Sequence, residues 1–209
     1  MDSLLTVEIP AGLKNLNYEA FAYCDKLKTI YISGNEPVEG TFDLSNITSL
    51  SSYALHSCSA VEKVILGDIA NISSHAFSKC TSLETVTVNN TNTVNVAANA
   101  FYAANSTNKN MKTVFFKGSM TATATSFTDV AVKIYVSSAE DAEAFNALGY
   151  TNAKAVYYDG NGTVSGVITT QGFQVRLEDY NGLRSIFSVD EGKIASTRPW
   201  DILLLNTVQ

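Results

Sequence analysis

The feature that most constrains this chain is an internal repeat. An apolar-x-x-apolar-x-apolar spacing recurs as Leu4-Val7-Ile9, Leu27-Ile30-Ile32, Val61-Val64-Leu66, Leu83-Val86-Val88, Met111-Val114-Phe116 and, in weaker form, Ala131-Ile134-Val136. Successive starts lie 23, 34, 22, 28 and 20 residues apart. Self-similarity at such a period is typical of solenoids, in which each unit buries its apolar face only against its neighbours.

A second motif keeps phase with the first. It is an Ala-Phe or Ala-Leu pair followed by a small residue, and it occurs as Ala20-Phe21 with Cys24, Ala54-Leu55 with Cys58, Ala76-Phe77 with Cys80, and Ala100-Phe101 with Ala104. Two motifs in phase are much less expected by chance than either alone. The longer steps are explained by insertions around Gly34 to Gly40 and Asn105 to Asn110, which we expect to loop out.

Each unit therefore predicts one short strand, a turn, and an Ala-Phe segment that closes the back of the coil. Because side chains alternate along a strand, the apolar positions point inward and stack from coil to coil. The predicted ladders are Val7, Ile30, Val64, Val86 and Val114 in one column and Ile9, Ile32, Leu66, Val88 and Phe116 in the next. A coil that advances in one direction requires these strands to pair in parallel.

Residues Leu5 to Pro10 followed by Tyr18 to Cys24, and Ile72 to Leu83, resemble the BspA-like leucine-rich-repeat family of bacterial cell-surface proteins. The resemblance covers about Leu4 to Val136. It implies a mainly β fold, a curved right-handed solenoid of parallel strands, with a role in adhesion or ligand binding at the cell surface or after secretion. Ala104, which replaces the repeat cysteine, and the long second repeat depart from the family pattern.

The segment after the repeats changes character. Ser137 to Tyr150 carries a serine cap, early acids and a late glycine, which predict one short helix that caps the stack. Beyond it we expect strands at Lys154–Asp159, Thr163–Thr169, Phe173–Glu178, Leu183–Val189 and Asp201–Asn206. The predicted organisation is a solenoid with its capping helix over 1–152 and a small antiparallel β module over 153–209.

Charge and hydropathy exclude several classes of partner. Fourteen Lys and Arg against 20 Asp and Glu give a net charge of −6, and there is no basic run to attract nucleic acid or anionic lipid. The apolar runs are too short to insert in a membrane. No export signal is visible, and because Leu4 already belongs to a repeat, we expect Met1 to lie within a longer protein.

The residues with reactive side chains do not form a recognisable catalytic set. Cys24, Cys58 and Cys80 share one phase of the coil, so we interpret them as buried free thiols in the core. His56 and His75 occupy non-equivalent positions, and a surface or hydrogen-bonded role is the better interpretation of both. No nucleophile motif, phosphate loop, cofactor site or metal-ligand spacing is present, so we expect a protein that is not an enzyme.

A ligand surface is predicted on the open, concave face of the strands. The residue between the two inward positions must point outward, and this column reads Glu8, Tyr31, Ile65, Thr87, Phe115 and Tyr135. Its upstream neighbours are Thr6, Thr29, Lys63, Thr85, Thr113 and Lys133. Exposed aromatic and apolar stripes often mark binding sites, although such residues are also good strand formers. The candidate ligand-binding residues are Tyr31, Lys63, Ile65, Phe115, Lys133 and Tyr135.

The leading hypothesis is a non-catalytic adhesion module that recognises a protein ligand, such as host extracellular matrix or another surface protein, through this face. It rests on the fold and the resemblance. The alternatives are a carbohydrate-binding accessory protein of a surface glycan-uptake system, in which the rings would stack on sugars, and a structural spacer.

Overall fold

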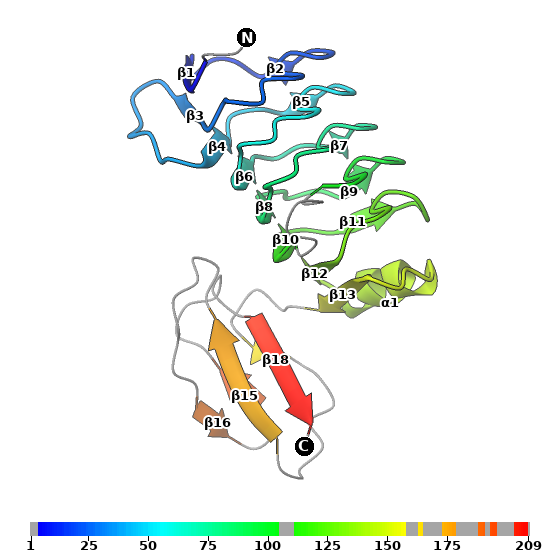
Figure 1. Ribbon diagram of the computed structural model, residues 1–209. Helices are drawn as coiled ribbons and strands as arrows, with labels where there is room; N and C mark the ends of the chain where they lie inside the picture. The colour runs from blue at the N-terminus through cyan, green and yellow to red at the C-terminus, as the bar shows by residue number, and fades with distance from the viewer. Residues whose placement is uncertain are drawn as a thin grey trace.

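The computed structural model describes residues 4–104 and 111–157, together with the strand segments 163–164, 173–178, 188–190, 193–195 and 203–208. Residues 4–157 form a solenoid in which the chain passes repeatedly between two sheets of parallel strands (Figure 1). The mainly β, parallel-strand solenoid expected from the repeat is therefore confirmed.

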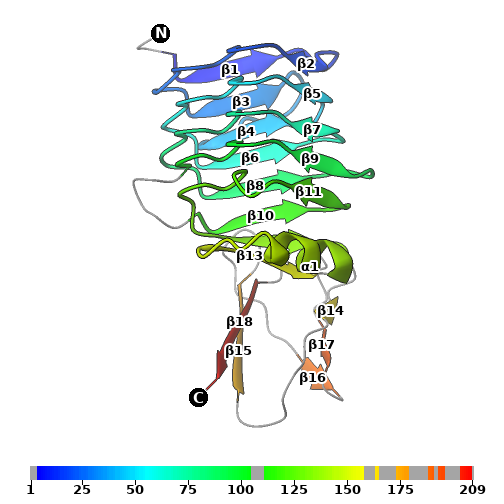
Figure 2. The same ribbon diagram turned by 90° about the vertical axis from the view of Figure 1, so that its right-hand side faces the viewer.

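Two parallel sheets form the walls of the coil (Figure 2). The larger sheet has eight strands, in the spatial order β1 (Thr6–Ile9), β3 (Thr29–Ile32), β4 (Thr41–Leu44), β6 (Lys63–Leu66), β8 (Thr85–Val88), β10 (Thr113–Phe116), β12 (Val132–Val136) and β13 (Ala153–Tyr157). The smaller sheet has five, namely β2 (Asn15–Leu16), β5 (Ser49–Leu50), β7 (Asn71–Ile72), β9 (Val94–Val96) and β11 (Met120–Ala122).

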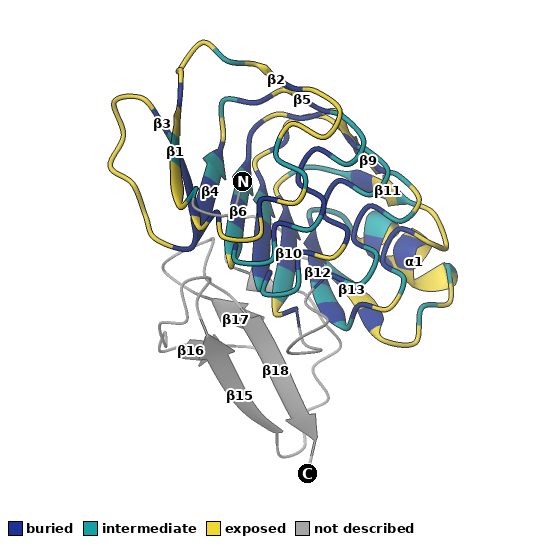
Figure 3. Ribbon diagram, turned by 45° about the horizontal axis from the view of Figure 1, so that its top comes forward, coloured by how far each residue is buried: buried dark blue, intermediate teal, exposed yellow. Residues whose placement is uncertain are grey.

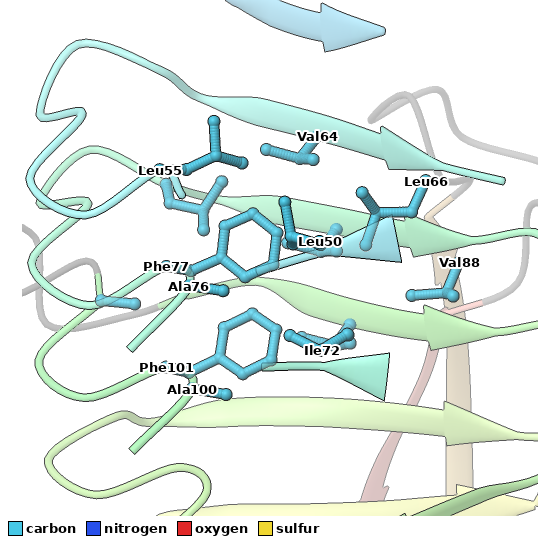
Figure 4. Packing of buried hydrophobic residues seen from close by; sticks show 14 of the residues in the cluster. Leu50, Leu55, Val64, Leu66, Ile72, Ala76, Phe77, Val88, Ala100 and Phe101 are labelled. Carbon is cyan, nitrogen blue, oxygen red and sulfur yellow. The ribbon is translucent and has the colours of Figure 1, made fainter. Parts of the chain in front are cut away.

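The predicted apolar ladders run along the inside of the large sheet. Val64 aligns with Val86, and Leu66 aligns with Val88, and all four are completely buried. The Ala-Phe segments stack against them from the turns, where the rings of Phe77 and Phe101 lie one above the other (Figure 4). The ring centroids are 5.1 Å apart, so the strand ladders and the Ala-Phe segments together form one continuous core.

One strand was missed by the repeat spacing. Thr41–Leu44 forms β4, which lies between β3 and β6, so Ile30 is not the ladder neighbour of Val64 as predicted. Phe42 stands between them. The spacing fails here because Glu39 occupies the position where the pattern requires its first apolar residue.

The coil that begins at β3 is shortened. Residues 33–40, hereafter the return loop, connect β3 directly to β4, and β2 pairs directly with β5. The loop projects on the side of the large sheet that faces away from the small one, and most of it is exposed (Figure 3). The predicted insertion does loop out, but it replaces the back half of a coil and is not added to a complete one.

Backbone hydrogen bonds join the turns of successive coils. The Leu55 amide donates to the Ala76 carbonyl at 3.1 Å, and the Phe77 amide donates to that of Ala100 at 2.8 Å. These bonds satisfy polar backbone groups where no regular sheet passes. Several turn residues adopt a left-handed backbone, namely Glu19, Tyr23, Tyr53, Ser57, His75, Lys79, Asn99, Ala103 and Asp129.

Helix α1 (Ala139–Ala147) closes the stack, as the sequence predicts. The Ser138 hydroxyl caps it by accepting a hydrogen bond from the Asp141 amide at 3.0 Å. Phe145 is buried at the end of the ring ladder, 5.6 Å from Phe127. The helix takes the place of a small-sheet strand in the last coil (Figure 2).

The strand predicted at Lys154–Asp159 belongs to the solenoid sheet. It forms β13, which pairs in parallel with β12, whereas we had assigned it to the C-terminal module. Further along are β14 (Thr163–Val164), β15 (Phe173–Glu178), β16 (Ser188–Asp190), β17 (Lys193–Ala195) and β18 (Leu203–Val208). Their pairings, β14 with β17, β16 with β17 and β15 with β18, are antiparallel. Much of the predicted strands Thr163–Thr169 and Leu183–Val189 lies outside the described residues.

Candidate binding surface on the large sheet

The outer face of the large sheet is the candidate site, and its residues are set by strand alternation. The column between the inward positions reads Glu8, Tyr31, Asp43, Ile65, Thr87, Phe115, Tyr135 and Val156 in spatial order. Asp43 was not predicted, because its strand was missed. The pair Phe42 and Leu44, two positions apart, is the signal that could have revealed it.

The first half of this column is open to solvent. Glu8 is exposed, and Tyr31, Asp43, Ile65 and Thr87 are half-buried. Lys63, which lies two residues before Ile65 on the same face of the sheet, is also half-buried. The structure therefore brings together Tyr31, Lys63 and Ile65, with Asp43 inserted among them.

The second half of the column differs from the prediction. Phe115 is only 6% exposed and Tyr135 only 3%, so neither is part of an open stripe. The two residues are neighbours in register on adjacent strands, which lie about 4.8 Å apart in the sheet. Burial also raises the pKa of the Tyr135 phenol well above its ordinary value. Alternation predicts the side on which a residue leaves the sheet but not whether that side stays open.

The upstream column is also less exposed than predicted. Thr29 and Thr85 are 4% and 5% exposed, whereas Lys133 is half-buried. Short threonine side chains are enclosed by larger neighbours in the adjoining column, while lysine stems extend past them. Lys63 and Lys133 are the half-buried lysines of this column, Thr113 is also half-buried, and Thr6 is exposed.

Hydrogen bonds hold the open half in place. The Tyr31 hydroxyl donates to Glu8 Oε2 at 2.9 Å. Hydrogen bonds from Ser33 and Tyr31 lower the pKa of the Glu8 carboxyl below its ordinary value. The same bond raises the pKa of Tyr31. A charge-assisted bond of this kind orients the ring across two strands.

The return loop borders this surface. Asn35 Nδ2 donates to Asp43 Oδ2 at 3.3 Å, and Glu39 forms an ion pair with Lys28 at 3.5 Å. Val38, in the turn that leads into β4, is 59% exposed and is one of the large apolar side chains of the described residues that are open to solvent. The loop therefore carries an exposed apolar residue and is bonded to the open half of the sheet through Asp43.

The cysteines occupy the core, as predicted. All three are free and buried. The thiol of Cys58 donates to the Phe21 carbonyl and that of Cys80 to the Leu55 carbonyl, each at 3.1 Å. Burial raises the pKa of Cys80 to about 12 and raises that of Cys58 further. These thiols bridge successive coils and are unsuited to nucleophilic chemistry.

The two histidines have different environments. His75 is half-buried, and its Nδ1 lies 2.7 Å from the Ser74 hydroxyl, so the predicted hydrogen-bonded role fits it. His56 is only 7% exposed, and its Nδ1 has no hydrogen-bond partner in the described part of the chain. The interpretation of His56 as a surface or hydrogen-bonded residue is therefore wrong. It lies beneath tyrosine rings that the sequence alone does not bring together.

Comparison with known proteins decides the family. A family model described as the BspA type leucine rich repeat region matches residues 1–129 in six copies. The chain belongs to the BspA-type leucine-rich-repeat family. Solenoids of this family are repeat modules that generally mediate protein interactions, are typically surface-associated and are generally non-catalytic. No curated protein and no solved structure matches the chain.

Within residues 4–104, 111–157 and the later strand segments, no three His, Cys, Asp or Glu side chains converge as metal ligands. The described portion also holds no helix with the length and apolarity needed to cross a bilayer.

Proposed function

We propose that this BspA-type solenoid is a non-catalytic, cell-surface protein-binding module, and that its partner docks on the open half of the large sheet beside the return loop. The observation that carries the proposal is the row of half-buried side chains, centred on Tyr31 and Ile65, to which the projecting return loop with its exposed Val38 is bonded through Asp43. Such an exposed apolar and aromatic surface with a polar rim is typical of protein interaction sites.

The surface is organised before a partner arrives. Tyr31 is bonded to Glu8, and Asp43 is bonded to the return loop through Asn35. Side chains that are already held lose less conformational entropy on binding, which favours affinity. Tyrosine is also among the residues that most often dominate the energetics of an interface.

Charge indicates the chemistry of the partner. Glu8 and Glu36 lie close enough to Tyr31 to affect its pKa, Asp43 is the strand neighbour of Ile65, and Glu39 in the return loop is already paired with Lys28. Lys63 adds one further positive charge at the side of the row. We therefore expect a partner surface that combines apolar residues with lysine or arginine, because complementary charge speeds docking and selects the orientation.

The set of proposed contact residues changes accordingly. Tyr31, Lys63 and Ile65 form its centre, with Asp43 and Val38 added. Lys133 lies at the far end of the same face and stays a proposed contact. Phe115 and Tyr135 leave the set because they are buried.

The test is a binding screen of the purified chain on an array of extracellular-matrix and bacterial surface proteins, followed by variants of the chain. Tyr31→Ala/Ile65→Ala should weaken a protein hit at least about tenfold, as expected when interface anchors are truncated. The matched control is Asn71→Ala/Asn95→Ala, on the exposed face of the small sheet. Unchanged affinity in the first variant, or an equal loss in the control, would overturn the proposal.

A further inference from the structure

A second surface lies on the turns that carry the Ala-Phe and Ala-Leu segments. Residues 17–23, 51–57 and 73–79, hereafter the turn ridge, stack in three successive coils. Their aromatic side chains gather into one cluster of three tyrosines and two histidines, namely Tyr18, Tyr23, Tyr53, His56 and His75. The proposed protein-binding face does not include any of them.

The cluster is built from ring contacts between coils. Tyr53 stacks flat on His75, with centroids 4.6 Å apart and an angle of 2° between the planes. The edge-to-face contacts of Tyr53 with Tyr18 and with His56 measure 5.8 and 5.4 Å. Tyr23 meets His56 at 5.1 Å. These contacts fix the orientation of rings that would otherwise rotate freely.

Two of the rings remain open to solvent. Tyr18 is 62% exposed and Tyr23 is 64% exposed, the largest values among the exposed large apolar side chains of the described chain. Each is anchored along one side by a neighbouring ring, so each presents a positioned aromatic surface to water.

The backbone beneath the rings is strained. Tyr23 and Tyr53 have φ values of 60° and 59°, in the left-handed region that glycine and asparagine tolerate best. Bulky aromatic residues are rarely found there. The same left-handed backbone recurs in the turns of the other coils, so the conformation belongs to the repeat and the choice of an aromatic residue there is the unusual feature.

The fold itself does not require aromatic residues at these positions. In the next coil the equivalent left-handed positions hold Asn99 and Ala103, with φ values of 58° and 51°. The same turn is therefore made with a small or polar residue. The rings at these left-handed positions, Tyr23, Tyr53 and His75, all lie in the turn ridge, and the turn can form without them.

His56 supplies an independent observation. Its imidazole is 93% buried beneath Tyr23 and Tyr53, and its Nδ1 lacks a hydrogen-bond partner within the described residues. Burying a polar atom unpaired costs free energy that an apolar residue at this site would avoid. The chain thus places the unpaired Nδ1 of His56 beside exposed rings, at a cost to its own stability.

The chemistry of the ridge favours an uncharged ligand rich in hydroxyl groups. The three turns contain one acid, Glu19, and one base, Lys79, so their charges cancel. The same turns contain Ser52, Ser57 and Ser74, and the Ser74 hydroxyl lies 2.7 Å from His75 Nδ1. The negative face of an aromatic ring attracts the C–H groups of a sugar, and nearby hydroxyls can bond to its oxygens.

Size argues against a protein as the main occupant. A stable protein interface uses roughly 20–30 residues on each side. The exposed aromatic part of the ridge is much smaller, whereas a few pyranose rings of a polysaccharide chain need only such a narrow platform.

We propose that the turn ridge is a carbohydrate-binding site that takes a neutral hexopyranose polysaccharide, with Tyr18 and Tyr23 stacking on sugar rings and Tyr53, His56 and His75 holding them in place. This site is separate from the protein-binding face. A BspA-type module of this kind could engage a protein and a glycan at the same time.

Affinity electrophoresis tests the proposal. The chain carries a net charge of −6 and migrates in a native gel, and an uncharged polymer leaves that charge unchanged. Gels would contain, one at a time, a soluble β-glucan, starch, a galactomannan or a glucomannan, all of them neutral polymers of hexopyranose units. We expect the wild-type chain to be retarded by at least one of them, relative to a gel without polysaccharide and to a reference protein.

The deciding variant is Tyr18→Ala/Tyr23→Asn, in which asparagine fits the left-handed backbone at position 23. Its retardation should disappear while its melting temperature stays within a few degrees of that of the wild type, because both side chains are largely exposed. Tyr31→Ala, on the outer face of the large sheet, is the control and should remain retarded.

Three results would overturn the glycan site. The wild-type chain could run unretarded in all four gels, the double variant could remain retarded, or Tyr31→Ala could lose retardation instead. If the double variant abolished binding to a protein partner and left every glycan gel unchanged, the ridge would be a protein site. Failure of the Tyr31→Ala/Ile65→Ala test leaves this experiment unaffected, because the two surfaces share no residue.

Discussion

The ring ladder inside the solenoid makes a quantitative prediction about stability. Phe101 is completely buried and stacks between Phe77 and Phe127, with centroid distances of 5.1 and 4.7 Å. Replacing it with alanine leaves a gap that these two rings bound on either side. Because each ring is anchored in its own coil, the gap cannot close fully. Truncation of a buried phenylalanine costs about 3–5 kcal/mol, and we expect Phe101→Ala to lie in the upper half of that range.

This loss is large compared with the total free energy of unfolding. A domain of this kind is stable by about 5–15 kcal/mol, so the variant should fold but unfold at much lower urea concentration. Each coil contacts mainly its neighbours, so a central defect should also reduce cooperativity and lower the slope of the transition. Urea titration followed by far-ultraviolet circular dichroism measures both quantities.

Two controls accompany the titration. Phe101→Leu keeps most of the volume and should cost clearly less than the alanine change. Tyr102→Ala alters the neighbouring, half-buried residue and should cost under about 1 kcal/mol. If Phe101→Ala costs less than about 1 kcal/mol, the ring ladder does not hold the coils together and the packing argument fails.

Three further predictions follow from individual residues. Gly67→Ala would place a Cβ 2.1 Å from the Ser45 carbonyl oxygen, so its thermal midpoint should fall by many degrees, whereas an unchanged midpoint would show that the coils can separate at no cost. Cys80 should resist Ellman's reagent in the native chain and react once urea unfolds it, because burial raises its pKa to about 12; rapid native labelling would contradict this. Burial lowers the pKa of His56 below its ordinary value of 6.5. Between the lowered pKa and 6.5 the unfolded chain binds more protons than the folded chain, so the free energy of unfolding decreases as the pH falls through this range. Thermal midpoints measured from pH 7.5 to 5 should therefore fall less in His56→Phe than in the wild type, and equal slopes would refute the assignment.

The coil could be predicted from the sequence because the apolar strand spacing and the Ala-Phe segment both mark residues of the same core. Val64 and Leu66 on the strand and Phe77 in the turn are all core positions, and apolar periodicity is what a core requires. Helix α1 was predictable for a similar reason, since its Ser138 cap and early acids are local signals.

The errors came from places where the signal is not local. Strand β4 was missed because Glu39 breaks the pattern in a shortened coil, and the exposure of Phe115 and Tyr135 was misjudged because alternation does not report what lies above a sheet face. The tyrosine and histidine cluster was also out of reach. Tyr53 meets Tyr18 and His75 only through the stacking register and a left-handed turn that sequence rules assign to glycine or asparagine.

The central claim is that the open half of the large sheet, with its return loop, is the surface that binds a protein. The most direct measurement is hydrogen–deuterium exchange of the chain with and without a protein partner obtained from the array. We expect slower exchange in β3, β4 and residues 33–40, with the small sheet unchanged. Protection confined to β7 and β9, or to the turn ridge, would contradict it.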